Sequence, residues 1–543
     1  MSRPADLSGN GKSKQNTMFG GVAILAVGIA IVKVIGALFK IPLFNILGEE
    51  GATDFNSAYS IYSVLLTVST AGLPVALSKT VSEANTLGRH NQKQKVFRVA
   101  LSAFVAMGVL SFLIMWLGGD WLAGRMNNPH AAPGIRALAP AVVCVGCLSA
   151  FRGYAQGHMH MAPTSVSQII EALCKLFLGL GLAAFVMSRS AAGFGEGEQT
   201  SLAAAGAITG VTVGTVLALV YMSANYLRTR RHTYRPGEDR AQGSGTILKN
   251  LLRIAIPITL STSLVPVINL LDNAIVLGRL QDALGMSETA SRTLYGNYAV
   301  ALSLYNLPSS FMTAFTAAII PAVSAALARH DREGTRRITG SVLRVTALLA
   351  LPMGVGLCAL SGPIMQMLYP KYDVSITGPL LAVLAPTAVC VCLVLVSNSV
   401  LQAHGYVQLP IVTVLAGGAV KIVSNYFLVA KPELNIYGAS LGMLLCYGVT
   451  LALNLFFLYR LCSVGGYARV FVRPLLASVL MGAAAWAVHG LLWKTLGNLV
   501  AVGVSICAAV VVYLVLVLAL KAVSKDDVML MPKGEKIAKI LKI

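Results

Sequence analysis

Residues 138–158, LAPAVVCVGCLSAFRGYAQGH, reappear in altered form at residues 384–404 as LAPTAVCVCLVLVSNSVLQAH. The two stretches align without gaps and share Leu-Ala-Pro, Val-Cys-Val and a closing Gln-x-His. The same offset of 246 residues places Lys175 against Lys421. A match that holds at one offset over this distance indicates an internal repeat, so the chain is predicted to contain two related halves.

The composition around these stretches indicates a membrane protein. The 543 residues are 56% hydrophobic and only 12% charged, with a mean hydropathy of +0.73, whereas soluble domains are about 25% charged. Apolar runs of about 20 residues, the length of a bilayer-crossing helix, recur along the chain. We therefore expect an all-α polytopic membrane protein. Nine cysteines lie within or beside these runs, which favours small buried apolar residues over a redox pair.

About fourteen apolar runs are predicted to be transmembrane helices. The first follows a polar segment and is too long for a signal peptide, so we expect it to be retained. The predicted helices lie near residues 19–47, 55–80, 96–118, 132–155, 164–188, 201–226, 248–279, 294–327, 338–361, 378–402, 410–430, 437–461, 470–492 and 498–521.

The repeat offset corresponds to six helices, which preserves the orientation of each helix in the membrane. We therefore expect two parallel six-helix bundles that face a cavity, a geometry typical of transporters. In chain order the predicted parts are a cytoplasmic N-terminal segment (1–18), a first bundle (19–226), a basic cytoplasmic linker (227–247), a second bundle (248–461), two additional helices (470–521) and a basic cytoplasmic tail (522–543).

The basic excess of the chain, 42 Lys and Arg against 21 Asp and Glu, does not indicate a nucleic-acid partner. The basic residues concentrate in alternate short loops, as the positive-inside rule requires, so both termini are predicted to be cytoplasmic. No nucleic-acid motif accompanies them. The basic loops and the closing sequence MPKGEKIAKILKI favour contact with anionic membrane lipid, although a solvated tail fits that last segment equally well.

Two lysines in the first predicted helix are the strongest functional signal. Lys33 lies near the middle of the helix, and Lys40 follows seven residues later on nearly the same face, about 10 Å away along the axis. A charge at a helix centre costs roughly 2.5–3.5 kcal/mol, which makes such a residue a candidate for function. Lys40 can also extend to the outer interface, but Lys33 cannot. The pair predicts an anion site, with phosphate as the preferred ligand.

Glu171 and Lys175 form a second candidate on the fifth predicted helix. Their spacing of four residues fits either a self-contained ion pair or a role in the cavity. Lys421, the repeat partner of Lys175, has Gly417 where the acid would stand. Lys421 is therefore predicted to face the cavity as a further ammonium group.

Asp272 and Asn425, on the seventh and eleventh predicted helices, are candidates for binding a coupling cation. Asp272 is alternatively a partner for one of the lysines. His158-Met-His160 has no carboxylate or cysteine nearby, which argues against a metal site. No catalytic residue and no cofactor are predicted.

Three longer stretches carry a family resemblance. They are VKVIGALFKIPLFNILGEEGATDFNSAYSIYSVLLTVSTAGLPVALSKTVSE (32–83), FRGYAQGHMHMAPTSVSQIIE (151–171) and LYNLPSSFMTAFTAAIIPAVSAAL (304–327). They resemble the multidrug/oligosaccharidyl-lipid/polysaccharide exporter superfamily, and within it the polysaccharide-export branch that includes sporulation-type proteins and MurJ/MviN-type lipid II flippases. The resemblance covers nearly the whole chain and implies a MATE/MurJ-like fold.

The resemblance implies a monomer in the bacterial cytoplasmic membrane. It would move an undecaprenyl-pyrophosphate-linked saccharide, lipid II or a related cell-wall precursor, by alternating access. In this family basic residues on the first helix and an acid after it line the cavity, and Lys33, Lys40 and Asp54 occupy the matching positions. Ser303 stands five residues before Pro308, where the MurJ-type pattern has arginine, which favours the sporulation-type branch. The last two helices are implied to hold the prenyl chain.

Two other functions compete with this interpretation. A cation-coupled multidrug exporter of the same fold would require deep carboxylates in the first bundle, where this chain has lysines. A membrane-bound glycosyl- or acyltransferase would require paired acids or a His/Asp set in a sizeable loop. The longest connection, 227–247, contains only Glu238 and Asp239 as acids.

Overall fold

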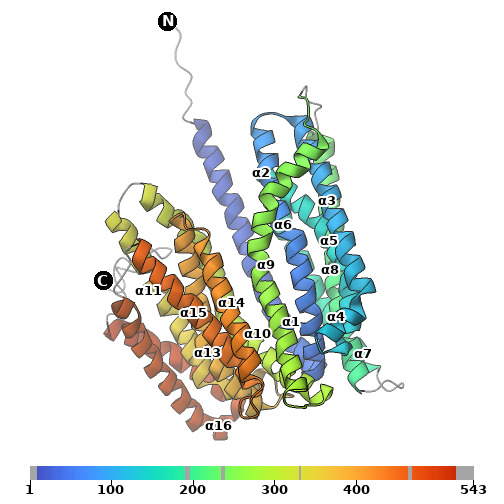
Figure 1. The fold of residues 1–543 in the computed structure, drawn as a ribbon. Coiled ribbons are helices and arrows are strands. Elements are labelled where there is room, and N and C mark those ends of the chain that lie inside the picture. The colour runs from blue at the N-terminus through green and yellow to red at the C-terminus, as the bar shows by residue number, and fades with distance from the viewer. Residues whose placement is uncertain are drawn as a thin grey trace. The chain divides into compact units, whose positions relative to one another are not determined.

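The structure is a computed structural model, and it describes residues 9–189, 196–233, 239–328, 332–462, 467–520 and 522. All regular elements in these ranges are helical (Figure 1). The predicted tail 522–543 and the middle of the predicted linker 227–247 lie almost wholly outside the described residues. So does much of the predicted N-terminal segment 1–18.

The chain divides into two compact units, Met1–Asn273 and Ala274–Ile543. The first contains α1 (Gly9–Thr70), α2 (Gly72–Thr86), α3 (His90–Leu117), α4 (Gly119–Arg125), η1 (Pro129–Ala131), α5 (Ala132–Gly157), α6 (Ala162–Cys174), η2 (Lys175–Gly179), α7 (Leu180–Ser188), α8 (Glu196–Thr233) and most of α9 (Ser244–Asp282). The second contains α10 (Glu288–Ala328), α11 (Arg332–Ala359), α12 (Ser361–Leu368), α13 (Val374–Ala403), α14 (Leu409–Leu428), α15 (Tyr437–Cys462) and α16 (Tyr467–Ala519).

The described helices confirm the prediction of fourteen membrane-crossing segments. Eleven segments are long and apolar enough to cross a membrane. Two of them contain a glycine in the left-handed region, Gly48 in α1 (φ 70°) and Gly497 in α16 (φ 75°), at which one helix ends and the next begins. Side chains are disfavoured in that region, so glycine permits the turn. Each of these segments crosses twice, and α10, with 41 residues, adds the fourteenth crossing.

The apolar cores of the two units show how the helices are held. In the first unit, Ile247, Leu251 and Ala255 of α9 pack with residues of α2, α3 and α5 in one buried cluster. This packing explains why most of α9 belongs to the first unit. In the second unit, a cluster that includes Leu343 of α11 and Val396 of α13 joins residues of α10, α15 and α16.

Glycines of α8 bring the middle of the fifth crossing close to α8. A Cβ atom on Gly210 would lie 2.3 Å from the backbone nitrogen of Gly179, and one on Gly214 would lie 2.9 Å from Cys174 Cβ. Small residues allow helix backbones to approach in this way. The adjoining segment η2, which begins at Lys175, is a π-helical turn. Such turns occur frequently at functional sites.

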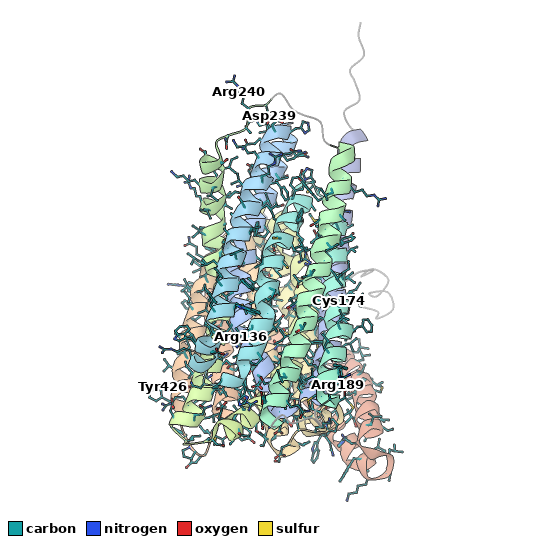
Figure 2. The ribbon with its side chains drawn as sticks, turned by 90° about the vertical axis from the view of Figure 1, so that its right-hand side faces the viewer. Arg136, Cys174, Arg189, Asp239, Arg240 and Tyr426 are labelled. Carbon is teal, nitrogen blue, oxygen red and sulfur yellow. The ribbon has the colours of Figure 1, made fainter. Side chains whose placement is uncertain are left out.

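Charged residues lie toward both ends of the first-unit helices. Figure 2 shows Asp239 and Arg240 at one end of this unit and Arg136 and Arg189 toward the other. At the first end, the two carboxylate oxygens of Asp239 accept hydrogen bonds from the backbone N–H groups of Asn91 (2.9 Å) and Gln92 (2.8 Å). Partial desolvation opposes this effect, but the backbone N–H groups hold the pKa of Asp239 below its usual value. The chain before α9 is thereby tied to the start of α3.

Candidate functional site

A cavity of about 550 Å³ lies within the first unit. Its walls come from both parts of α1 and from α2, α5, α6, η2 and α8. Among the residues that the structure describes, four charged side chains line it, namely Lys33, Arg152, Glu171 and Lys175. We call it the Lys175 cavity. Three cations against one carboxylate give it a surplus of positive charge.

Arg152 and Glu171 form an ion pair in the wall of this cavity. An Arg152 Nη atom lies 2.5 Å from a Glu171 carboxylate oxygen, and Arg152 Nε donates to Ser167 Oγ at 2.9 Å. The two side chains are only 14% and 24% exposed. Glu171 therefore pairs with an arginine on α5 and not with Lys175, four residues later on its own helical crossing. The α-helical register ends where Lys175 begins the π-helical turn.

Two aromatic rings surround the ammonium group of Lys175. Its Nζ lies 4.8 Å from the ring centroid of Phe39 and 4.9 Å from that of Tyr59. The ring of Phe55 stacks on Tyr59 at 5.7 Å and contacts Phe39 at 6.3 Å, which fixes the arrangement. Cation–π contacts stabilise the ammonium charge without neutralising it. The charge of Lys175 therefore remains available to an anion.

The two lysines of the first crossing lie in or beside the same cavity. Lys33 is part of the lining and is exposed, whereas Lys40 is half-buried. The positive charges of Lys175 and Lys33 both act on Lys40. The predicted pair on α1 thus forms one cationic cluster with Lys175, and like charges held this close favour an anionic ligand.

Asp54 lies outside the cavity lining, in a buried polar cluster of the first unit. Asn128 donates one hydrogen bond to Asp54 at 3.0 Å and another to Ser57 Oγ at 3.2 Å. Ser57 in turn donates to Asn273 at 3.3 Å. The cluster joins α1 after Gly48 to α9 and to the chain before α5. The structure therefore places Asp54 outside the cavity lining, and its contact with substrate stays a prediction.

The remaining predicted residues are buried elsewhere in their own units. Lys421 is 2% exposed and Asn425 is fully buried on α14 of the second unit. A Cβ on Gly442 of α15 would lie 1.7 Å from Asn425 Oδ1, so the two helices pack closely there. Asp272 is 5% exposed in the first unit. Within the first unit the structure thus groups Lys33, Lys40, Glu171 and Lys175, whereas Asp272 is not among the residues that line their cavity.

Arg152 is the site residue that sequence reasoning missed. It lies inside the predicted helix 132–155, and its counterpart in the repeat is the neutral Asn398. In the second unit Asn398 accepts a hydrogen bond from Asn454 at 2.8 Å. In the repeat alignment, an arginine of the first half matches an uncharged asparagine of the second half. This difference was a sequence signal that the charged site lies in the first half.

Comparison with known proteins identifies the family of the chain. A Polysaccharide biosynthesis protein family model matches residues 19–327, and a MatE model matches residues 257–427. Three similar proteins come from Bacillus subtilis (strain 168). The uncharacterized membrane protein YabM is 26% identical (97% of each chain), Lipid II flippase MurJ 25% (86% of this chain, 87% of that one) and Stage V sporulation protein B 22% (96% and 98%).

Solved structures share the fold. A lipid II flippase MurJ in an inward closed conformation matches with a TM-score of 0.68 at 12% identity, covering 91% of this chain and 98% of that one. An inward-facing MATE-family multidrug transporter matches with a TM-score of 0.63 at 15% identity, covering 81% and 98%. Since the family model covers more than half of the sequence, the chain belongs to the polysaccharide biosynthesis protein family.

Proposed function

We propose that this transporter moves a lipid-linked pyrophosphate saccharide, lipid II or a related cell-wall glycan precursor, across the bacterial cytoplasmic membrane. The observation that carries the proposal is the charge of the Lys175 cavity, where Lys33, Arg152 and Lys175 face a single carboxylate. A pyrophosphate supplies several negative oxygens close together. Lysine binds such oxygens as a point charge and arginine binds them with two parallel hydrogen bonds.

The relatives support the same substrate class. The Bacillus subtilis protein named Lipid II flippase MurJ aligns with 86% of this chain, and Stage V sporulation protein B aligns with 96%. The similarity of this chain to these two proteins, at 25% and 22% identity, supports a lipid-linked substrate.

Cation-coupled multidrug export is the second candidate, because the MatE model matches residues 257–427 and MATE structures share the fold. A cavity for cationic drugs needs uncompensated carboxylates. In the Lys175 cavity the one carboxylate, Glu171, is already paired with Arg152. The charge of the cavity therefore favours an anionic substrate.

Reconstitution separates the two candidates. The full chain is placed in liposomes that carry a fluorescent undecaprenyl-pyrophosphate disaccharide-peptide, and exposure of the substrate to an added quencher is followed. We expect faster exchange between leaflets than in protein-free liposomes, and no uptake of ethidium driven by a sodium or proton gradient. Ethidium transport without lipid exchange would refute the flippase assignment.

The orientation of the chain in the membrane is also proposed from its charges. Arg228 lies near the end of α8 that leads toward Arg240, whereas Arg125 ends α4 between the end of α3 and the start of α5. The excess of basic residues near Arg228 favours a cytoplasmic location. In a variant without the nine native cysteines, an impermeant maleimide on intact cells should label Arg125→Cys and spare Arg228→Cys. Labelling of Arg228→Cys but not of Arg125→Cys would contradict the proposed orientation.

A further inference from the structure

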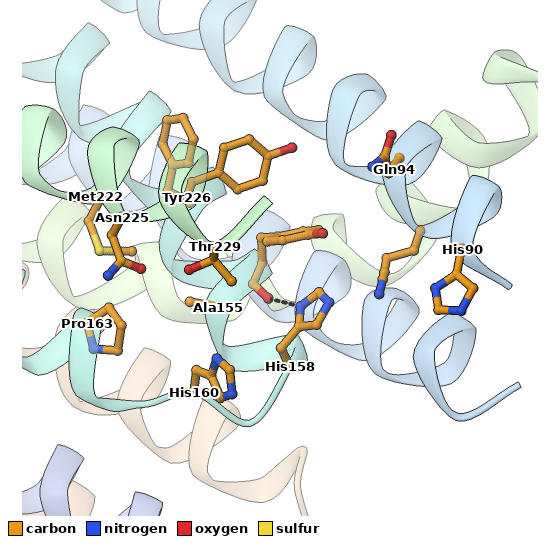
Figure 3. A pocket seen from close by; sticks show the side chains of 13 residues that line it. His90, Gln94, Ala155, His158, His160, Pro163, Met222, Asn225, Tyr226 and Thr229 are labelled. Carbon is orange, nitrogen blue, oxygen red and sulfur yellow. Dashed lines mark hydrogen bonds between the residues drawn. The ribbon is translucent and has the colours of Figure 1, made fainter. Parts of the chain in front are cut away.

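A second pocket lies in the first unit, at the end where α3 begins, α5 ends and α6 begins (Figure 3). Its basic lining residues are His90, Lys93, His158 and His160, and we call it the histidine pocket. Among the described residues that line it there is no Asp or Glu. It shares no lining residue with the Lys175 cavity.

Hydrogen bonds fix how two of these basic groups face the pocket. His158 Nδ1 lies 2.9 Å from the carbonyl oxygen of Tyr154, as the dashed line in Figure 3 shows. A carbonyl only accepts, so Nδ1 carries the proton and donates, and Nε2 is the ring atom left to meet a ligand. Lys93, which is 9% exposed, donates to Asn85 at 3.1 Å and retains two further N–H donors.

The groups around His158 make the protonation of its ring sensitive to a bound anion. Burial lowers the pKa of His158, and the positive charges of Lys93 and His160 lower it further, although the bond to the Tyr154 carbonyl opposes them. The other titratable groups on the pocket walls are His90 from α3, Tyr154 from α5 and Tyr226 from α8. Asp239 lies near His90, which helps to lower the pKa of Asp239, and both oxygens of this carboxylate accept backbone N–H groups of α3. An anion in the pocket would reverse the effect of the positive neighbours on His158.

The rest of the lining is amphipathic. Phe151, Tyr154 and Tyr226 form an aromatic wall. The ring centroid of Tyr226 lies 5.4 Å from that of Phe151 and 5.3 Å from that of Tyr154. Met222 continues the apolar side, while Asn225 and Thr229 add amide and hydroxyl groups. The pocket has a volume of about 110 Å³, which suits a phosphate group with a few attached carbons and not a whole nucleotide.

We propose that the histidine pocket binds the phosphate group of an anionic membrane phospholipid. Lys93 and the three histidines meet the phosphate, and the aromatic wall meets the glycerol carbons. The location at the ends of membrane-crossing helices favours a lipid over free phosphate, which presents the same charged group. Bound lipid would join the start of α3, the turn between α5 and α6, and the last turns of α8. This site is independent of the substrate proposed for the Lys175 cavity.

The test measures binding of phosphatidylglycerol to the purified full chain by native mass spectrometry in a neutral detergent. A phosphodiester keeps one negative charge between about pH 6 and pH 8, so any change in affinity over that range reports the protein. Because the bound anion favours protonated His158, affinity should rise as the pH falls, by up to about tenfold per pH unit for one proton taken up. An affinity independent of pH would argue against the histidines as ligands.

Three variants locate the site. His160→Gln changes an exposed side chain and Lys93→Gln a buried one, and each should weaken phosphatidylglycerol binding at least fivefold at pH 6. His160→Gln keeps the test valid if Lys93→Gln folds poorly. Arg98→Gln is the matched control, because Arg98 is an exposed cation on α3 that lines a different groove. Equal binding by wild type, His160→Gln and Lys93→Gln would overturn the proposal.

Titration with inorganic phosphate distinguishes the two sources of the anion. We expect millimolar phosphate to leave phosphatidylglycerol bound, because it lacks the glycerol contacts. Displacement at micromolar phosphate, lost in His160→Gln, would overturn the lipid as occupant and assign the pocket to soluble phosphate.

Discussion

Replacing Lys33 with alanine is expected to reduce lipid exchange by roughly 10- to 150-fold, the loss that corresponds to one charge-assisted contact of about 1.5–3 kcal/mol. Lys33 lines the Lys175 cavity and makes no ion pair among the described residues. The amount of protein in the membrane should stay near normal, since removing a charge from a membrane helix favours insertion. The measurement is the exchange rate in proteoliposomes, normalised to reconstituted protein.

Two companion variants sharpen this result. Lys33→Arg should retain part of the activity, because it preserves the charge while changing its shape. Lys79→Ala is the matched control, since that lysine lies on α2 with 62% of its side chain exposed. If Lys33→Ala exchanges the lipid-linked pyrophosphate as fast as Lys79→Ala does, the cationic cluster is not the substrate site.

The sequence was a good guide to the number of helices, and one lysine that it singled out, Lys33, lines the Lys175 cavity. Lys33 stood out because a lysine in a long apolar run is costly, whatever the tertiary structure. The fourteen crossings followed from the lengths of the apolar runs. Gly48 and Gly497 end their helices with so short a turn that the two crossings on either side form one continuous element.

The partners of the charges were beyond the sequence. Periodicity gives the spacing of residues along one helix but not which face of a neighbour they meet. Glu171 appeared suited to Lys175 on its own helix, yet it pairs with Arg152 of α5. Lys175 instead lies against Phe39 and Tyr59 of α1. Both outcomes depend on how α1, α5 and α6 pack together.

The π-helical turn and the burial of Lys421 could not be predicted from the sequence for the same reason. Nothing local in Lys175–Gly179 specifies a π-helix. The turn coincides with the point where Gly179 meets Gly210 of α8 at backbone contact distance. Lys421 matches Lys175 in the repeat, but α14 buries it to 2% exposure. A repeat at the level of sequence therefore did not imply the same environment in both units.

Glu171→Gln is expected to tighten binding of the lipid-linked pyrophosphate while slowing its transport. In the structure a carboxylate oxygen of Glu171 lies 2.5 Å from an Nη atom of Arg152. A pyrophosphate must therefore compete with this carboxylate for the guanidinium group. Glutamine keeps the size of the side chain and removes the competing charge. A gain of about 1–2 kcal/mol in binding corresponds to an affinity increase of roughly 5- to 30-fold.

Transport should fall in the same variant because the carboxylate also assists release. After the substrate leaves, Glu171 can return to Arg152, which lowers the free energy of the empty cavity; without that return, the bound state is favoured on both sides of the membrane. Affinity is measured as quenching of a fluorescent lipid-linked pyrophosphate by the detergent-purified protein, and transport as exchange in proteoliposomes. The two should move in opposite directions.

Gln168→Glu provides the reciprocal control. Gln168 lines the same cavity one turn before Glu171 on α6, so a carboxylate there adds a second competitor for the cations. It should weaken binding, the opposite of the Glu171→Gln effect. If Glu171→Gln also weakens binding, then Glu171 contacts the substrate directly, as an acceptor for saccharide hydroxyl groups would, and the competing counter-ion role is wrong. If affinity and transport both rise, the carboxylate has no part in release, and the step that limits transport lies outside the Arg152–Glu171 pair.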